Sequence, residues 1–170
     1  MDLKKYIWDV QDFPIKGITF KDITPVLNNI EAFKYTVDQM SEYVKSRGAN
    51  VIVAPEARGF VFASAVAYVT GCRFVLVRKP NKLPRKVKDI KYDLEYGSGH
   101  IQIHEDDLKV NDKVVIIDDV LATGGTMEAI INLVEDSNAL VEGIVFLADI
   151  TSLHKPEIFD KYNWKTLVSY

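Results

Sequence analysis

The sequence predicts an α/β fold in which helices flank a central, mostly parallel sheet. Three short apolar runs indicate the strands, at residues 51–54, 74–77 and 114–117. Runs rich in valine and isoleucine are typical of strands that are buried on both faces, as in parallel sheets. Segments with helical apolar spacing alternate with these runs, at about 29–46, 60–68 and 127–134. This alternation favours a parallel sheet with helical crossovers.

The bulk properties limit the kinds of partner. The 170 residues have the length of one domain, with 48% apolar and 26% charged residues and a formal net charge of −3. That charge gives no general attraction to nucleic acid or to an acidic membrane. No apolar run approaches a membrane-spanning helix, and the first residues do not form a signal peptide. The single Cys72 excludes an internal disulfide, so we expect a cytoplasmic protein without nucleic-acid or membrane partners.

The stretch 114–126 organises the chain. Its apolar run ends in Asp118 and Asp119, and Ala-Thr-Gly-Gly-Thr and a helical segment follow. Glycines allow a tight turn with exposed N–H groups, and the helix N-terminus favours an anion there. The simple alternatives are that Gly-Gly is only a turn and that Asp-Asp only caps the helix. The stretch also differs from two known nucleotide-binding motifs, the dinucleotide fingerprint and the Walker A loop. A phosphate in the loop, with two carboxylates near hydroxyls or a divalent cation, fits a sugar phosphate.

The N-terminal third is predicted as follows. Residues 3–10 have the spacing of a short amphipathic helix capped by Asp2, and the proline-punctuated segment 13–25 favours an ordered loop. Asn28 or Asn29 then caps the long helix that ends near Ser46. After the strand at 51–54 comes Glu-x-Arg-Gly, which could be a surface ion pair or part of a binding loop.

The second half begins with a basic segment, 78–88, which follows the strand at 74–77. A solvated surface loop is the simple alternative for such a charge run. Residues 92–97 and 100–104 are predicted as the arms of a hairpin turned at 97–99. Another strand is expected at 141–147, and a helix turn and an edge strand are expected within 156–170. His100 and His104 lack metal-ligand spacing and are expected to be ordinary strand residues.

Several separate motifs, from about residue 13 to about residue 148, resemble the type I phosphoribosyltransferases, particularly those that use adenine. The stretch 114–126 is similar to their phosphoribosyl pyrophosphate (PRPP) motif. The resemblance implies purine salvage: Mg²⁺-dependent transfer of ribose 5-phosphate from PRPP to adenine, giving AMP and pyrophosphate. It also implies one domain over residues 1–170, with an N-terminal hood (1–27) over the base, a lid hairpin (78–104), and a homodimer in which Arg78 or Lys79 reaches the partner's site.

The resemblance also implies the site residues. PRPP and AMP would be held by Asp118, Asp119, Ala122, Thr123, Gly124, Gly125 and Thr126. Pyrophosphate would be bound by Arg58, Arg78, Lys79 and Lys82, with a cis peptide next to Ala57. Adenine would be bound by Thr19, Phe20 and Lys21, although Lys21 stands where the family usually has arginine. Glu95 and Arg58 would be catalytic, and Mg²⁺ would be held mainly by PRPP, with water between it and Asp118 or Asp119.

Two alternatives remain open at the level of sequence. The first is a phosphoribosyltransferase for another purine, such as hypoxanthine or xanthine, which the hood and the Leu-Glu-Tyr-Gly segment at 94–97 disfavour. The second is a non-catalytic PRPP-sensing regulator of DNA or RNA. That alternative needs a nucleic-acid module or a basic face, and the only basic cluster lies in the lid segment.

Overall fold

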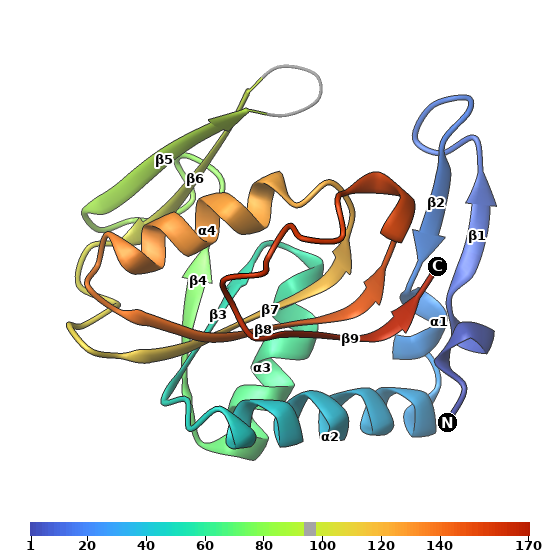
Figure 1. The fold of residues 1–170 in the computed structure, drawn as a ribbon, viewed down its shortest axis with the longest axis horizontal. Coiled ribbons are helices and arrows are strands. Elements are labelled where there is room, and N and C mark those ends of the chain that lie inside the picture. Colours follow the sequence, from blue (N-terminus) through green and yellow to red (C-terminus); the bar gives the residue numbers. More distant parts are fainter. Residues whose placement is uncertain (94–97) are drawn as a thin grey trace.

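The computed structural model describes residues 1–93 and 98–170, and its centre is a five-stranded parallel sheet with the strand order β4-β3-β7-β8-β9 (Figure 1). In sheet order the strands are β4 (Arg73–Val77), β3 (Val51–Pro55), β7 (Lys113–Leu121), β8 (Leu140–Asp149) and β9 (Trp164–Ser169). The α/β prediction is therefore confirmed. The connection direction reverses between β3 and β7, and open α/β sheets bind ligands at the carboxyl ends of such a strand pair.

Helices cover both faces of the sheet. α2 (Ile30–Ser46) and α3 (Arg58–Thr70) lie on one face, and α4 (Gly125–Glu135) lies on the other (Figure 1). Alternate strand residues serve the two layers: Ile52 packs with α2 and α3, whereas its neighbour Val53 packs with α4. Asn29 caps α2 by accepting a hydrogen bond from the Ala32 N–H at 2.9 Å, as predicted.

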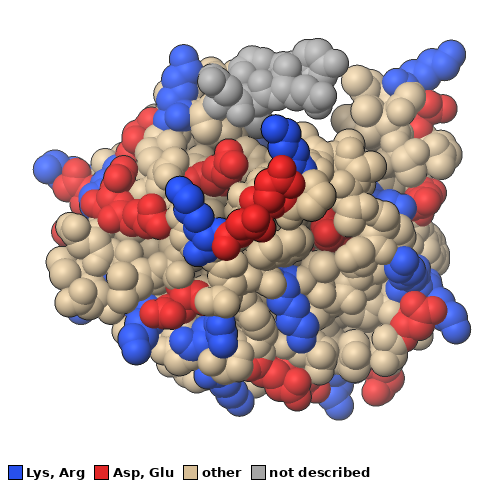
Figure 2. All heavy atoms as spheres, in the orientation of Figure 1, with Lys and Arg blue, Asp and Glu red and all other residues tan. Residues whose placement is uncertain are grey.

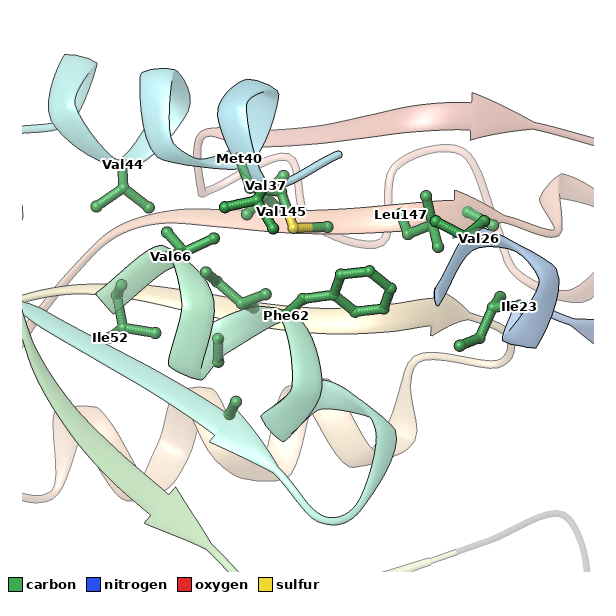
Figure 3. Packing of buried hydrophobic residues seen from close by; sticks show 14 of the residues in the cluster. Ile23, Val26, Val37, Met40, Val44, Ile52, Phe62, Val66, Val145 and Leu147 are labelled. Carbon is green, nitrogen blue, oxygen red and sulfur yellow. The ribbon is translucent and has the colours of Figure 1, made fainter. Parts of the chain in front are cut away.

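The core between α2, α3 and the sheet is apolar and closed. Met40 and Val44 of α2, Phe62 and Val66 of α3 and Val145 of β8 belong to one cluster, and Figure 3 shows Val145 between Met40 and Phe62. All five side chains are fully buried. Burial of each side chain of this size contributes roughly 1.5–3 kcal/mol to the stability of the fold. This packing therefore fixes the position of helix α3 against the sheet.

The N-terminal segment corrects two predictions. The helix expected at residues 3–10 ends after one 3₁₀ turn, η1 (Leu3–Tyr6), and is followed by β1 (Trp8–Gln11). The loop expected at 13–25 contains β2 (Thr19–Asp22) and the short helix α1 (Thr24–Leu27). The apolar spacing of residues 3–10 did not predict the structure, because Trp8 and Val10 are exposed and do not pack into the core. Antiparallel pairing with β2 holds β1 in place instead.

The second hairpin consists of β5 (Val87–Asp93) and β6 (Ser98–His104). Its turn cannot lie at 97–99 as predicted, because Ser98 and Gly99 belong to β6; Gly97 lies outside the described residues. Ile101 and Ile103 are buried in the same layer as α4, beside which the hairpin stands (Figure 1). Both histidines of β6 are strand residues, as predicted.

The last segment is partly as predicted. β9 is the edge strand of the sheet. The expected helix turn is not formed between residues 156 and 162, where the chain makes non-helical turns; the 3₁₀ turn η2 (Thr151–Leu153) comes earlier. Phe159 is buried against Phe146 and Trp164, so these turns follow core packing more than local propensity.

Charges of both signs are interspersed over the face seen in Figure 2, without a broad patch of one sign. Among the described helices, none combines the length and the apolarity that crossing a membrane requires.

Candidate active site

Two loops meet where the sheet order reverses. The loop from β3 to α3 carries Glu56 and Ala57 and leads into Arg58, the first residue of α3, and the loop from β7 to α4 carries residues 122–124. Between them is a pocket of about 220 Å³. It is lined by Pro55, Glu56, Ala57, Arg58, Asp118, Asp119, Val120, Leu121, Ala122, Thr123, Gly124, Thr126, Met127 and Phe146. The structure thus brings the predicted PRPP residues, apart from Gly125, and Arg58 to one cavity.

The acid pair lies within β7, not beyond its end. β7 continues to Leu121 because Val120 and Leu121 still pair with β8. Asp119 is buried, and Asp118 Oδ1 accepts a hydrogen bond from the Asp119 N–H at 2.8 Å. Burial and then the neighbouring Asp119 carboxylate raise the pKa of Asp118 well above its usual value. Ionisation of both carboxyl groups at once is therefore unfavourable in the folded protein.

Arg58 is the cation nearest to this charge. Its Nε lies 2.8 Å from Oδ2 of Asp119. The N–H does not point along that line, so within the described part of the chain the buried Oδ2 has no hydrogen-bond donor. A buried acceptor without a donor is unusual and suits a hydroxyl or a metal-bound water of a ligand. The Arg58 guanidinium carbon also lies 4.9 Å from the ring centroid of Phe20.

The loop 122–126 has the geometry of an anion site. Gly124 has φ of +89°, and a Cβ there would collide with Ile158 Cδ1, so this position requires glycine. α4 begins at Gly125, and the N–H groups of a first helical turn have no intrahelical acceptor. Gly124, Thr126 and Met127 at this helix N-terminus line the pocket, so the donors and the positive end of the helix dipole are placed beside it, where they can bind a phosphate.

Glu56 connects this pocket to the basic segment. It accepts a hydrogen bond from the Lys79 N–H at 2.6 Å, and the Arg78 Nε lies 3.4 Å from the same oxygen. Partial burial alone would raise the pKa of Glu56, but the Lys79 N–H and the Arg78 guanidinium outweigh it and lower the pKa. A second cavity, of about 430 Å³, is lined by Glu56, Arg78, Lys79, Tyr92 and Thr126 among others. The Lys82 side chain is exposed, and its carbonyl accepts from Arg78 at 3.4 Å.

The three predicted hood residues differ in direction. Phe20 faces Arg58 and meets Phe13 edge-on at 5.0 Å. Lys21 Nζ is bound by Asp9 at 2.6 Å and lies 3.7 Å from the Tyr170 ring centroid. The Thr19 hydroxyl donates to Gln11. Because neighbouring strand residues point to opposite faces, only Phe20 of the three turns its side chain toward the pocket.

Other sequence predictions are only partly accessible to structural description. The peptide bond between Glu56 and Ala57 is cis, as the resemblance implies. Glu95 lies outside the described residues. Sequence reasoning did not single out Tyr92, or Glu56 as the partner of 78–79, because both contacts join segments far apart in the chain.

The fold and the pocket define an α/β protein with a cavity at the switch point of its parallel sheet, and comparison with known proteins specifies its class. Residues 24–169 match the family model of the phosphoribosyl transferase domain. An adenine phosphoribosyltransferase of Mycoplasma capricolum is 64% identical over 170 residues, which is 100% of both chains.

Solved structures agree. The crystal structure of adenine phosphoribosyltransferase from Thermoanaerobacter pseudethanolicus has a TM-score of 0.95 and 43% identity, covering 99% of this chain and 98% of that one. The enzyme from Saccharomyces cerevisiae, complexed with an imino-altritol bisphosphate and adenine, has a TM-score of 0.88 and 31% identity, covering 98% and 96%. This chain belongs to the phosphoribosyltransferase family, and within that family it groups with the adenine phosphoribosyltransferases.

Proposed function

We propose that this protein transfers ribose 5-phosphate from PRPP to adenine, giving AMP and pyrophosphate, and so serves purine salvage. The observation that carries the proposal is the single pocket in which an acid pair, an N-terminal helix turn and Arg58 meet, with Phe20 of the hood on the other side of Arg58. Relatives that are named adenine phosphoribosyltransferases support the choice of base.

Each part of the substrate has a matching part of the pocket. The 5-phosphate binds the N–H groups and hydroxyls of residues 122–126, because they combine donors with the helix dipole. The ribose hydroxyls donate to Asp118 and Asp119. A ligand hydroxyl or a bound water then supplies the hydrogen bond that Asp119 Oδ2 lacks within the described residues. Adenine lies against Phe20, with the backbone of Thr19 and Lys21 at its edge. Pyrophosphate lies toward Arg58 and the segment of Arg78, Lys79 and Lys82.

The donors at the acid pair suit Mg²⁺, which prefers oxygen ligands and keeps several waters. The described residues contain no cluster of three or more His, Cys, Asp and Glu side chains placed to hold a metal. We therefore infer that PRPP brings Mg²⁺ with it, and that Asp118 and Asp119 hold it through water. When bound, the ion neutralises charge on the departing pyrophosphate.

The reaction forms a bond between adenine N9 and the anomeric carbon and breaks the bond from that carbon to pyrophosphate. Arg58 and the basic segment stabilise the negative charge that develops on the leaving group, where preorganised donors are most effective. The proton on N9 must leave, and Glu95 is proposed to accept it. The exposed side chains of Lys79 and Lys82 are proposed to close over pyrophosphate and exclude water.

We propose one catalytic domain over residues 1–170 that works as a cytoplasmic homodimer. Val61, Tyr68 and Val69 lie on one exposed side of α3, with Tyr68 91% exposed. Their i, i+7 and i+8 spacing places them on one side of the helix, which a second copy of the chain would cover. Sedimentation equilibrium tests this: the wild-type chain should be a dimer and Tyr68→Glu a monomer, and a monomeric wild type contradicts it.

The function is tested with purified protein, PRPP and Mg²⁺, offering adenine, hypoxanthine, guanine and xanthine in turn. Adenine should be consumed far faster than the other three, and removal of Mg²⁺ by EDTA should stop turnover. Equal use of a 6-oxopurine would contradict the choice of adenine. Tight PRPP binding without turnover of any base would favour the non-catalytic regulator.

A further inference from the structure

The β5–β6 hairpin touches the phosphate loop through one pair of hydroxyls. The Thr126 Oγ1 donates to the Tyr92 hydroxyl at 3.3 Å. Thr126 belongs to the first turn of α4 and lines both cavities, whereas Tyr92 lies on β5 and lines the second. The contact therefore sits at the boundary between the sugar-phosphate pocket and the cavity under the basic segment.

The position of the Tyr92 ring is built into the hairpin. Tyr92 pairs across the ladder with Gly99. A Cβ at residue 99 would lie 2.6 Å from Tyr92 Cζ and 2.8 Å from its hydroxyl oxygen. Glycine at this position lets the ring lie flat over the neighbouring strand and aim its hydroxyl at α4. Any side chain at residue 99 would therefore have to displace the ring from this position.

The chemistry of two hydroxyls gives this contact a function. A hydroxyl donates one hydrogen and accepts two hydrogen bonds, and between two hydroxyls the donor and acceptor can exchange roles. While the Thr126 hydroxyl donates its hydrogen to Tyr92, it can only accept hydrogen bonds from other groups. A phosphate ester has only acceptor oxygens, so Thr126 must turn its hydrogen toward the phosphate when the loop is occupied. Tyr92 can then donate to the oxygen that Thr126 leaves free.

We propose that Tyr92 is a positioning residue for phosphate binding: its hydroxyl holds the Thr126 side chain in place and donates to it when Thr126 donates to the 5-phosphate. The inference rests on the proposed function, because it takes the ligand of residues 122–126 to be a phosphate ester. Tyr92 itself does not touch the phosphate. Its effect passes through Thr126, and a chain of two aligned hydrogen bonds strengthens the second one.

The position also ties substrate binding to the hairpin. Tyr92 is three residues before Glu95 in the sequence, on the strand that leads to it. A hydrogen bond that strengthens when the phosphate is bound thus anchors this strand to the phosphate loop in the substrate complex. Removal of the Tyr92 hydroxyl should therefore weaken the binding of ligands that carry the phosphate and leave the binding of free adenine unchanged.

The test is a double-mutant cycle with Tyr92→Phe and Thr126→Val, read out as the Kd of AMP by calorimetry, together with the KM values for PRPP and adenine. Tyr92→Phe keeps the ring and removes the hydroxyl, so it should raise the AMP Kd and the PRPP KM by about 3- to 10-fold, the size expected for one net hydrogen bond. The KM for adenine should stay within about twofold. In the Thr126→Val background, Tyr92→Phe should have no further effect on the AMP Kd.

A matched control is Tyr162→Phe, which removes the hydroxyl that donates to Glu135 at 2.8 Å, away from both cavities. It should leave the AMP Kd unchanged. An unchanged AMP Kd in Tyr92→Phe, or an equal loss on both Thr126 backgrounds, overturns the proposal while leaving the enzyme's function intact. Wild-type protein that binds neither AMP nor PRPP would instead overturn the proposed function, and this inference with it.

Discussion

Arg58 reaches Asp119 across the gap between the two loops of the site, with Nε 2.8 Å from Oδ2, although no hydrogen bond joins them. Arg58 is 44% exposed and Asp119 only 5% at the side chain, so the guanidinium is open to a ligand whereas the carboxylate is not. The ion pair keeps a cation beside the acid pair in a position from which it can also meet an anion in the pocket.

Replacement of Arg58 tests this arrangement. Arg58→Gln should lower kcat/KM for PRPP by roughly 10²–10³-fold, the cost of removing one donor to developing charge. Steady-state kinetics with varied PRPP provide the measurement. Arg73→Gln is a matched control, because Arg73 is 43% exposed and pairs with the buried Asp112 away from the pocket. It should affect stability and leave kcat/KM nearly unchanged; equal losses in the two variants would contradict a specific role for Arg58.

Asp118→Asn should raise stability while lowering activity. Because the folded pKa of Asp118 lies above its unfolded value, the folded state binds more protons, and stability falls as pH rises through that interval. Asparagine removes this loss, so at pH 7 the variant should unfold at higher denaturant than the wild type. Its kcat/KM for PRPP should fall by about 10- to 100-fold, because an amide replaces one of the two carboxyl groups that accept from the ribose hydroxyls.

Asp112→Asn provides the opposite control. Burial would raise the pKa of Asp112, but Arg73 and the Lys109 N–H outweigh it and lower the pKa. Its stabilising contribution is therefore present above the unfolded pKa and is lost as pH falls, so at pH 7 Asp112→Asn should be destabilised. If Asp118→Asn were destabilised in the same way, the acid pair would be a structural feature.

His154 should make stability depend on pH with the opposite sign to Asp112, because its contribution is lost as pH rises. Its Nε2 lies 2.7 Å from Asp149 Oδ1 and its Nδ1 lies 3.0 Å from the Lys155 carbonyl, so both ring nitrogens face acceptors. Burial alone would lower the pKa of His154, but Asp149 and the Lys155 carbonyl outweigh it and raise the pKa. This contribution is fully present below the unfolded pKa, near 6.5, and is lost as pH rises through the folded pKa.

Urea unfolding of the wild type and of His154→Gln, measured at several pH values from about 6 upward, checks this. Near pH 6, the free energy of unfolding of the variant should be about 3–5 kcal/mol lower than that of the wild type, because the buried Asp149 has lost its cation. The free energy of unfolding of the variant should also depend less on pH. His100→Gln, which removes an exposed pair with Asp89, should cost less than about 1 kcal/mol. Parallel pH curves for wild type and His154→Gln would remove the case for a charged His154.

Glu95→Gln tests the proposed general base. Glutamine keeps the shape and removes the charge, so kcat should fall by about 10²–10⁴-fold, the usual contribution of a positioned base. Binding of adenine and PRPP should persist. Rapid-quench kinetics must show that chemistry limits the rate; a kcat then within a few-fold of wild type would reduce Glu95 to an ion-pair partner.

Local signals predicted the centre of the fold, and long-range contacts decided the rest. The run 114–117 and the glycines at 124 and 125 act within one strand and one turn, so both the strand and the loop could be predicted. The Trp8–Asp22 pairing, the Lys79–Glu56 hydrogen bond and the Tyr92–Thr126 contact join distant segments that no periodicity relates. The raised pKa of Asp118 likewise depends on burial, which sequence spacing does not provide.

A crystal structure with AMP tests the central claim most directly, because one ligand probes the phosphate loop, the acid pair and the hood together. The account predicts the phosphate within hydrogen-bond distance of the N–H groups of residues 122–126, the ribose hydroxyls against Asp118 and Asp119, and the purine beside Phe20. A phosphate bound elsewhere, or a ribose that leaves the acid pair uncontacted, would contradict it.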